Sequence, residues 1–319
     1  MATAQRLRIE EPAPLPSLRP APRGPKLGER MLRLLRLLRL AFWRAFVHDA
    51  FATAKASAYS SIFTFFPVLL IVGSALANWR KGQPYLREIS YALGTILPAG
   101  SSTVMSFLKG AAQHPVEALT TTAIITLWTA SGVMISWMDG FRRCYELPKT
   151  WGLVKERLIA FLLVIFALTP MTFATLLVAL GSKIETRLLF YLDPDFSAFV
   201  LLLWGVIRWL IATLTSISVI ALIYHHAVPR TQPWHSVIPG ASLATILWFS
   251  VTVGFRSYLA HFGNFTTIYG SLGAIMALLA WMYLISLAIL VGAEFNALLF
   301  PRAMLGKELT AINSNKAVR

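Results

Sequence analysis

The chain has little charge and almost no cysteine, and both shortages limit what it can be. Only 13% of its 319 residues are charged, whereas soluble domains average about 25%, so most of the chain does not face water. The single cysteine, Cys144, excludes an internal disulfide and a thiolate metal cluster. Acidic residues are scarce, and the net charge is +15. In a soluble protein that charge would indicate nucleic-acid binding, but the positions of the charges favour another interpretation.

Sequence patterns of hydrolytic and nucleotide-binding enzymes are also missing. The six histidines make no H-E-x-x-H or H-x-H-x-D-H pattern. There is no G-x-S-x-G, G-x-x-x-x-G-K-[ST] or G-x-G-x-x-G motif. His225 and His226, with His235 nearby, are a weak metal candidate, because imidazoles at a helix end explain them more simply. We therefore expect no catalytic residue, no metal and no cofactor, and we do not expect an enzyme.

Long apolar runs dominate the chain, which is 56% hydrophobic and has a mean hydropathy of +0.64. Each run reaches the roughly 20 residues that cross a hydrocarbon core, and backbone groups in lipid must bond within their own segment, which predicts helices. The expected fold is all-α, a polytopic membrane protein with a six-transmembrane-helix bundle in residues 51–300. The six predicted spans are residues 57–77, 118–138, 159–181, 198–224, 237–260 and 270–299.

Lys and Arg alternate between rich and poor segments outside these spans. With the N-terminus inside, the inner segments hold 21 of them and the outer segments hold 6. The positive-inside rule therefore predicts that both termini are cytoplasmic. We expect no cleavable signal peptide, because the first long apolar run starts near residue 57.

The segments before and after the bundle have their own character. Residues 1–29 are rich in Pro and Arg and are predicted to be a disordered cytoplasmic tail, and residues 301–319 a second cytoplasmic tail. Residues 30–50 are predicted to form a basic amphipathic helix. It either lies in the anionic inner-leaflet interface or packs on the bundle while its arginines enforce topology. We expect membrane lipids, not nucleic acid, as the partners of Arg30, Arg33, Arg36, Arg39 and Arg44.

Ionisable side chains inside predicted spans are the main candidates for binding or coupling, because placing one in hydrocarbon costs at least about 2.5 kcal/mol. One interpretation is a polar cavity whose arginines attract an anionic group such as a lipid phosphate, with Glu294 coupling transport to protons. The other is that each group satisfies local contacts, Arg256 by snorkelling to the interface. The candidates are Arg208, Arg256, Glu294, Asn296 and Asp139.

Helix-breaking and small residues mark candidate gates or packing sites. Pro67 falls within the first span, where a proline removes a backbone hydrogen bond; such breaks line the substrate path in some transporters. Tyr269, Gly270 and Gly273 open the sixth span, and Gly292 lies near its inner end. Glycines at these positions suit either a gate or close helix packing.

Two motifs of the distal third carry a resemblance to a known family. They are Tyr269-Gly270-Ser271-Leu272-Gly273-Ala274 and Gly292-Ala293-Glu294-Phe295-Asn296-Ala297. With Pro239-Gly240-Ala241 and Phe65-Phe66-Pro67, they resemble the YihY/virulence factor BrkB family of bacterial inner-membrane proteins, over about residues 45–300. The chain departs from the family at Met138-Asp139-Gly140-Phe141, where members often have an Asn-containing segment, which weakens any role transferred there.

The resemblance implies six transmembrane helices in a bacterial inner membrane. Some members are linked with serum resistance and with transport of lipid or lipopolysaccharide precursors. Others were once labelled ribonuclease BN, and the missing metal-ligand pattern argues against that label here. We favour a transporter or flippase-like protein for an anionic amphipathic substrate, a lipid or a lipid-linked envelope precursor. The alternative is a non-transporting scaffold or envelope-assembly factor, and a ribonuclease is least favoured. The sequence leaves open whether the protein forms a homo-oligomer.

Overall fold

A computed structural model describes residues 27–78, 115–191, 194–229, 232–262 and 271–301, and its regular structure there is helical. The chain divides into two compact units, Met1–Arg36 and Leu37–Arg319, and the site described below lies wholly in the second. The helices are α1 (Leu27–Val47), α2 (Ala50–Asn78), α5 (Pro115–Cys144), α6 (Leu153–Tyr191), α7 (Pro194–His226), α8 (Trp234–Phe262) and α10 (Ser271–Leu299).

Five of these helices contain segments long and apolar enough to cross a membrane. The sixth prediction, residues 159–181, lies within α6, where side chains beyond residue 172 are outside the described set, so this span stays a prediction. The five candidate spans are Ala50–Ile71, Thr120–Cys144, Leu202–His226, Trp234–Tyr258 and Ile275–Leu299.

Except for α10, the helices of the bundle extend beyond the apolar runs from which they were predicted. α2 begins at Ala50 instead of residue 57, and α6 covers Leu153–Tyr191 instead of 159–181. Pro194 is the first residue of α7, a position where the fixed φ of proline suits the first helical turn. Hydropathy detects only the part of a helix that matches lipid, whereas the hydrogen-bonded backbone continues through adjoining polar turns.

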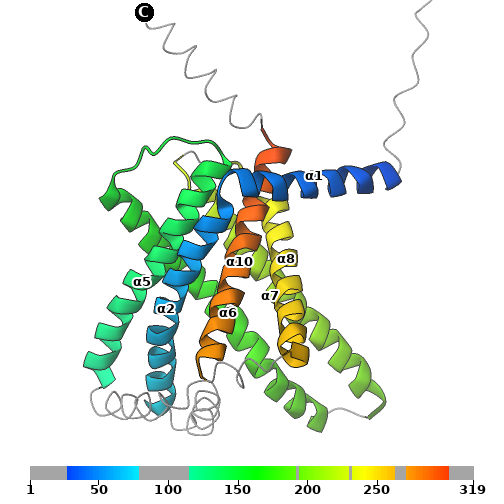
Figure 1. Cartoon of the computed structure of the whole chain (residues 1–319). Coiled ribbons are helices and arrows are strands. Elements are labelled where there is room, and N and C mark those ends of the chain that lie inside the picture. The colour runs from blue at the N-terminus through cyan, green and yellow to red at the C-terminus, as the bar shows by residue number, and fades with distance from the viewer. Residues whose placement is uncertain (1–26, 79–114, 192–193, 230–231, 263–270, 302–319) are drawn as a thin grey trace, which may run out of the picture. The chain divides into compact units, whose positions relative to one another are not determined.

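The helices of the second unit follow one another around the bundle (Figure 1). α2 packs on α5, α5 on α6, α6 on α7, α7 on α8, and α8 on α10. α10 then returns to α2 and also contacts α5. Chain neighbours are thus spatial neighbours, as short connections favour, and α10 closes the ring.

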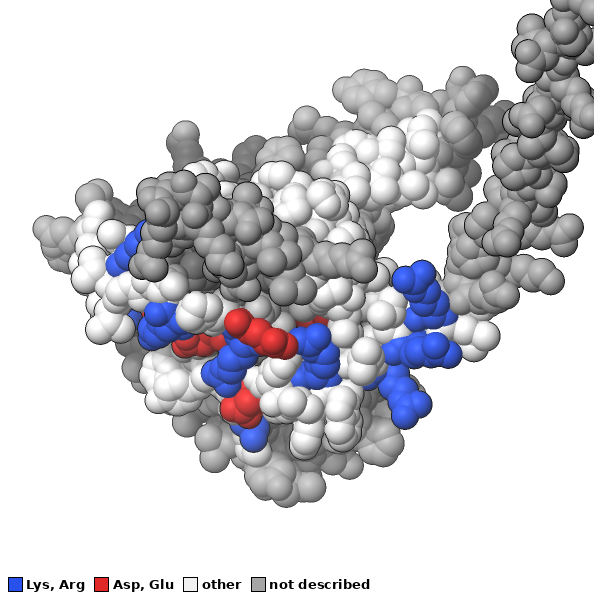
Figure 2. Space-filling model, turned by 90° about the horizontal axis from the view of Figure 1, so that it is seen from above, with Lys and Arg blue, Asp and Glu red and all other residues white. Residues whose placement is uncertain are grey.

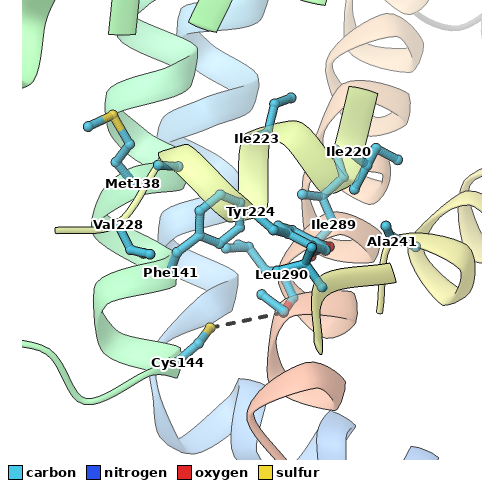
Figure 3. Close-up of a cluster of buried hydrophobic side chains, with 14 of the residues drawn as sticks. Met138, Phe141, Cys144, Ile220, Ile223, Tyr224, Val228, Ala241, Ile289 and Leu290 are labelled. Carbon is cyan, nitrogen blue, oxygen red and sulfur yellow. Dashed lines mark hydrogen bonds between the residues drawn. The ribbon is translucent and has the colours of Figure 1, made fainter. Parts of the chain in front are cut away.

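The buried core lies where α5, α7 and α10 approach their C-terminal ends (Figure 3). Met138, Phe141 and Leu290 are buried around the ring of Tyr224. Phe141 meets Tyr224 edge-on, with ring centroids 5.1 Å apart, an arrangement that aromatic pairs favour. The Tyr224 hydroxyl donates a hydrogen bond of 2.5 Å to the carbonyl of Ile289, which ties α7 to α10.

Large apolar side chains cover the outside of the bundle. Exposed examples are Trp128 on α5, Phe166 on α6, Val206 on α7 and Val253 on α8. A soluble monomer rarely exposes so much contiguous apolar surface, whereas a helix that faces lipid requires it. The described helices therefore form a multi-pass membrane bundle.

The ends of α1 differ from the predicted segment 30–50. The helix begins at Leu27 and ends at Val47, and Asp49, with φ of 57°, makes the turn into α2. Arg33, Arg36 and Arg39 are exposed; the membrane-interface position of this helix stays a prediction. Most of the predicted tails 1–29 and 301–319 lies outside the described residues.

Candidate functional site

Charged side chains of the second unit gather at one end of the bundle, which we call the charged end. It comprises the end of α1, the start of α2, the end of α5, the start of α6 and the end of α10. Figure 2 views this end and shows basic and acidic side chains intermixed there. It is the end that the distribution of Lys and Arg predicts to face the cytoplasm.

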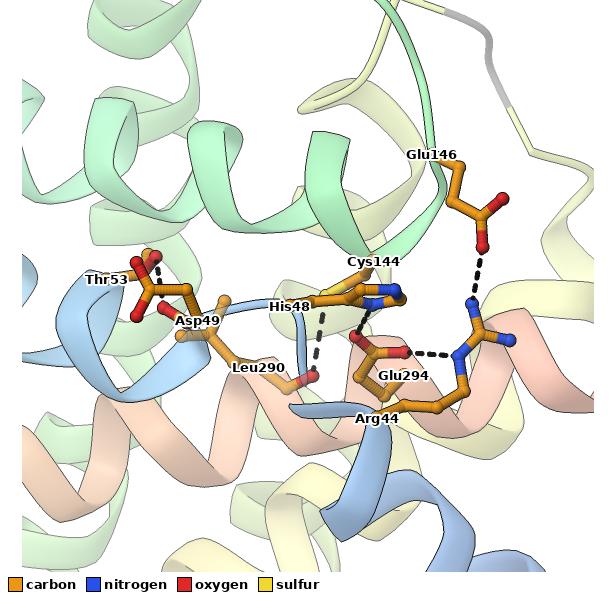
Figure 4. Close-up of polar contacts among 8 residues, drawn as sticks. All are labelled: Arg44, His48, Asp49, Thr53, Cys144, Glu146, Leu290 and Glu294. Atoms are coloured by element: carbon orange, nitrogen blue, oxygen red, sulfur yellow. Dashed lines mark hydrogen bonds and ion pairs between the residues drawn. The ribbon is translucent and has the colours of Figure 1, made fainter. Parts of the chain in front are cut away.

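Glu294 of α10 is the centre of the charged end, with a side chain that is 0% exposed. Its Oε1 lies 2.5 Å from Nδ1 of His48, and its Oε2 lies 3.3 Å from Nε of Arg44 (Figure 4). The Arg44 contact is an ion pair by distance, but Oε2 has no partner with hydrogen-bond geometry, so His48 makes the stronger contact. The His48–Glu294 hydrogen bond needs one proton, carried by either the imidazole or the carboxyl group.

Arg44 also reaches the surface of the protein. Its Nη2 donates a hydrogen bond of 3.0 Å to Oε1 of Glu146, which is exposed. Cys144 lies beside His48 and Glu294 in Figure 4. Burial raises the pKa of the neighbouring Tyr145 hydroxyl above its ordinary value, so this group stays neutral. Arg44 therefore links the buried carboxylate of Glu294 to the exposed carboxylate of Glu146.

The sequence singled out Glu294 and Arg44 separately and missed His48. Arg44 was grouped with the lipid-binding arginines, but in the structure it is directed at two carboxylates. A signal for His48 did exist, because residues four apart share one helix face. The backbone N–H of His48 still donates to the carbonyl of Arg44 at 2.8 Å, so the helical register of α1 presents both side chains to α10.

The other two predicted membrane charges lie elsewhere. Arg208 lies within α7 and is partly exposed, and Arg256 is exposed towards the end of α8. The ion pair and the hydrogen bond that hold Glu294 come from α1 and the turn after it. The depth of a residue along its span therefore did not predict the partner of Glu294.

Asp139 belongs to a second network at the charged end. Arg142 is buried and forms ion pairs with Asp139 and with Glu156. Glu156 is also buried and lies 3.6 Å from Nζ of Lys149. This network joins the end of α5 to the start of α6. Asp139 therefore helps to hold Arg142 at this junction, and its predicted role in binding stays a prediction.

Gly240 and Gly292 bring the backbones of α8 and α10 into contact. A Cβ at Gly292 would lie 2.6 Å from the Gly240 carbonyl oxygen, and a Cβ at Gly240 would overlap the Gly292 carbonyl oxygen. Asn296 is buried one turn further along α10. Its Oδ1 accepts a hydrogen bond of 2.6 Å from the Gly240 N–H, and its Nδ2 donates one of 3.0 Å to the Val237 carbonyl. The two bonded backbone groups lie on either side of Pro239, which has no N–H of its own. Gly292 therefore allows the close approach of α8 and α10, and Asn296 links the two helices.

Replacing the Asn296 side chain is expected to destabilise the bundle. Asn296→Ala removes two buried hydrogen bonds between α10 and α8, each worth about 0.5–1.5 kcal/mol, so we expect a loss of about 1–3 kcal/mol. Thermal unfolding in detergent micelles measures it. Thr213→Val is the control, because the exposed Thr213 hydroxyl bonds only the Trp209 carbonyl of its own helix. Equal losses in both variants would contradict the assigned role.

The remaining gate candidates are only partly described. Pro67 is half-buried in α2, which continues through it to Asn78. Gly273 is buried in α10, and Tyr269 and Gly270 lie outside the described residues. Their proposed gating role stays a prediction.

Metal binding has no geometric support among the residues that the structure describes, where no group of three His, Cys, Asp or Glu is placed to hold an ion. His225 instead stacks on Trp234, with ring centroids 4.3 Å apart, and meets His226 edge-on at 4.6 Å. These contacts resemble packing at a helix end.

Known proteins match this chain along most of its length. The family described as virulence factor BrkB matches residues 41–312. The ribonuclease-like protein YfkH of Bacillus subtilis (strain 168) is 29% identical over 85% of this chain and 98% of its own length. A UPF0761 membrane protein of Tolumonas auensis is 27% identical over 81% of this chain and 83% of its own. A UPF0761 membrane protein of Stenotrophomonas maltophilia (strain K279a) is 23% identical over 80% of this chain, but the match spans only 59% of that relative. No solved structure matches.

The family match includes all the residues of the Glu294 site, from the end of α1 to the end of α10. The relatives' names differ in what they say of activity, one being ribonuclease-like and others only membrane proteins. Family membership therefore establishes the class of protein and leaves its activity to be argued from the site. The chain belongs to the BrkB virulence-factor family of multi-pass membrane proteins.

Proposed function

We propose that the chain is a transporter or flippase-like protein for an anionic amphipathic substrate, a lipid or a lipid-linked envelope precursor. The observation that supports this most is Glu294, an ionisable side chain that is fully buried inside a candidate span. Ionisable groups within membrane segments are costly and commonly mark ion or substrate pathways. An apolar core would provide stability without that cost.

In this proposal Arg44, His48 and Glu294 form a gate at the charged end. Protonation of Glu294 removes the charge that attracts Arg44, which frees the end of α1 to separate from α10. The His48 side chain is 19% exposed and offers protons a route to the buried carboxyl group. A substrate phosphate can then replace Glu294 as the partner of Arg44, since guanidinium binds phosphate in bidentate geometry.

We place the charged end at the cytoplasmic face of a bacterial inner membrane. The inner segments hold 21 Lys and Arg against 6 in the outer segments, as the positive-inside rule requires. The sequence carries no P-loop motif, so uphill transport in this proposal draws on an ion gradient or on a partner protein.

Lipid movement in proteoliposomes tests the proposal. With fluorescent phosphatidylglycerol as the probe, we expect Glu294→Gln, which lacks the charge that holds Arg44, to leave the gate open. Without a gradient, transfer between leaflets should then be at least about tenfold faster than in wild type, a barrier change of about 1.4 kcal/mol, and it should no longer respond to an imposed proton gradient. Asp49→Asn is the matched control, since Asp49 is an exposed carboxylate of the same end and asparagine tolerates its positive φ. Normal, gradient-dependent transfer by folded Glu294→Gln contradicts the gate.

A scaffold or envelope-assembly factor is the second candidate, favoured by the exposed arginines and apolar side chains of α1. It predicts that deleting residues 1–36, which leaves Arg44 and His48 in place, abolishes function in cells. Glu294→Gln is then mild. Absence of lipid movement by wild type, with several lipid classes and an imposed gradient, favours this candidate.

A further inference from the structure

A pocket of about 380 Å³ lies between the first half of α6 and the end of α7. Ile159, Leu162 and Phe166 of α6 face Leu222 of α7 across it. Leu162 and Phe166 are also exposed on the outer surface of the bundle. The pocket is therefore open to the surrounding bilayer and has a volume typical of small-molecule sites.

The pocket has an aromatic and basic end. Trp151 and His226 also line the pocket, and Nζ of Lys155 lies 5.9 Å from the centroid of the Trp151 ring. Glu156, the carboxylate of this segment, is buried and shared between Arg142 and Lys149, so its charge is already compensated. Lys155 is exposed and can meet an anion from outside.

We propose that this pocket binds an anionic phospholipid of the bilayer, with one acyl chain against the α6–α7 wall and the phosphate at Lys155 and His226. Acyl chains fit the apolar lining, and tryptophan commonly lies at headgroup level. Basic pockets between helices on the cytoplasmic side bind anionic headgroups. The site uses α6 and α7 and none of the residues that hold Glu294, so it does not depend on transport.

Native mass spectrometry of the purified full chain tests this proposal, with phosphatidylglycerol and phosphatidylcholine of equal chain length as probes. We expect the wild type to retain one phosphatidylglycerol about fivefold better than phosphatidylcholine, because a lysine near an anionic group contributes an attraction of that order. Lys155→Gln should remove the preference but keep acyl-chain binding. Lys55→Gln, an exposed lysine of α2, should change nothing.

A second pair of variants separates the pocket from ordinary lipid contact. Leu162→Trp fills the pocket from its exposed side and should reduce retention of both lipids about tenfold. Ile165→Trp adds the same volume at an exposed position of α6 outside the pocket and should leave retention unchanged. Equal retention of the two lipids by wild type, or equal effects of the two tryptophans in variants with native circular dichroism, would overturn the proposal.

Discussion

Gly292→Ala is expected to lower the stability of the bundle by about 3 kcal/mol, the upper range for overpacking a close contact. The added Cβ would lie 2.6 Å from the Gly240 carbonyl oxygen, 2.6 Å from the Tyr224 hydroxyl and 2.8 Å from Cβ of Ala244. Two of these neighbours belong to the α8 helix, which cannot rotate away as a flexible side chain can. α8 and α10 must therefore separate, which also strains the Asn296 hydrogen bonds. Unfolding in detergent with increasing dodecyl sulfate measures the loss.

Gly254→Ala is the matched control for this change. Gly254 lies in α8, and a Cβ there meets nothing within 4 Å. Alanine favours helix over glycine by about 1 kcal/mol, so this variant should be as stable as wild type or more so. If both variants unfold at the same point, the α8–α10 contact is looser than the structure indicates.

His48→Ala is expected to cost about 3 kcal/mol, and Glu294→Gln in the same chain should restore most of that loss. Removing His48 leaves the buried Glu294 carboxylate with only the longer Arg44 contact, and breaking a buried ion pair costs about 3–5 kcal/mol in soluble proteins. Neutral glutamine has the shape of glutamate without its charge, so it relieves that cost. The double-mutant cycle, followed by unfolding in detergent, isolates the interaction between the two side chains.

Arg143→Ala provides the comparison with a surface pair. Arg143 and Asp49 lie 3.2 Å apart, with side chains 45% and 65% exposed, and exposed pairs contribute at most about 1 kcal/mol. A small loss is expected, and glutamine at position 294 should not change it. A His48→Ala loss that Glu294→Gln leaves undiminished would show that His48 acts by packing alone.

The sequence predicted the class of fold and most of its spans. Long apolar runs predict helices in lipid because the backbone has no other way to satisfy its hydrogen bonds, and five of the six runs contain candidate spans. Helix ends were predicted less well, as at the start of α6, because backbone hydrogen bonds continue through polar turns such as Leu153–Arg157.

The site was only half predictable. Glu294 could be found because a carboxylate in an apolar run is costly and needs a reason. Its partner His48 lies 246 residues away in the chain, and no local pattern relates the two. No local pattern predicts the contacts of Asn296 either, because its amide bonds the backbone of Val237 and Gly240 in another helix. Such contacts depend on which helices meet, which periodicity within one helix does not encode.

The closure of the ring by α10 has a consequence for biosynthesis. α2 and α8 both pack against α10, which is synthesised after them. Arg44 and His48 are also synthesised early, and they gain their buried partner only when Glu294 is in place. Ribosomes synthesise the chain from its N-terminus, so the helices before α10 enter the membrane before Arg44 and His48 can contact Glu294. A chain that stalls before α10 therefore exposes polar groups that membrane proteases and chaperones can recognise. Packing of α10, the last described helix, completes the bundle and buries these groups.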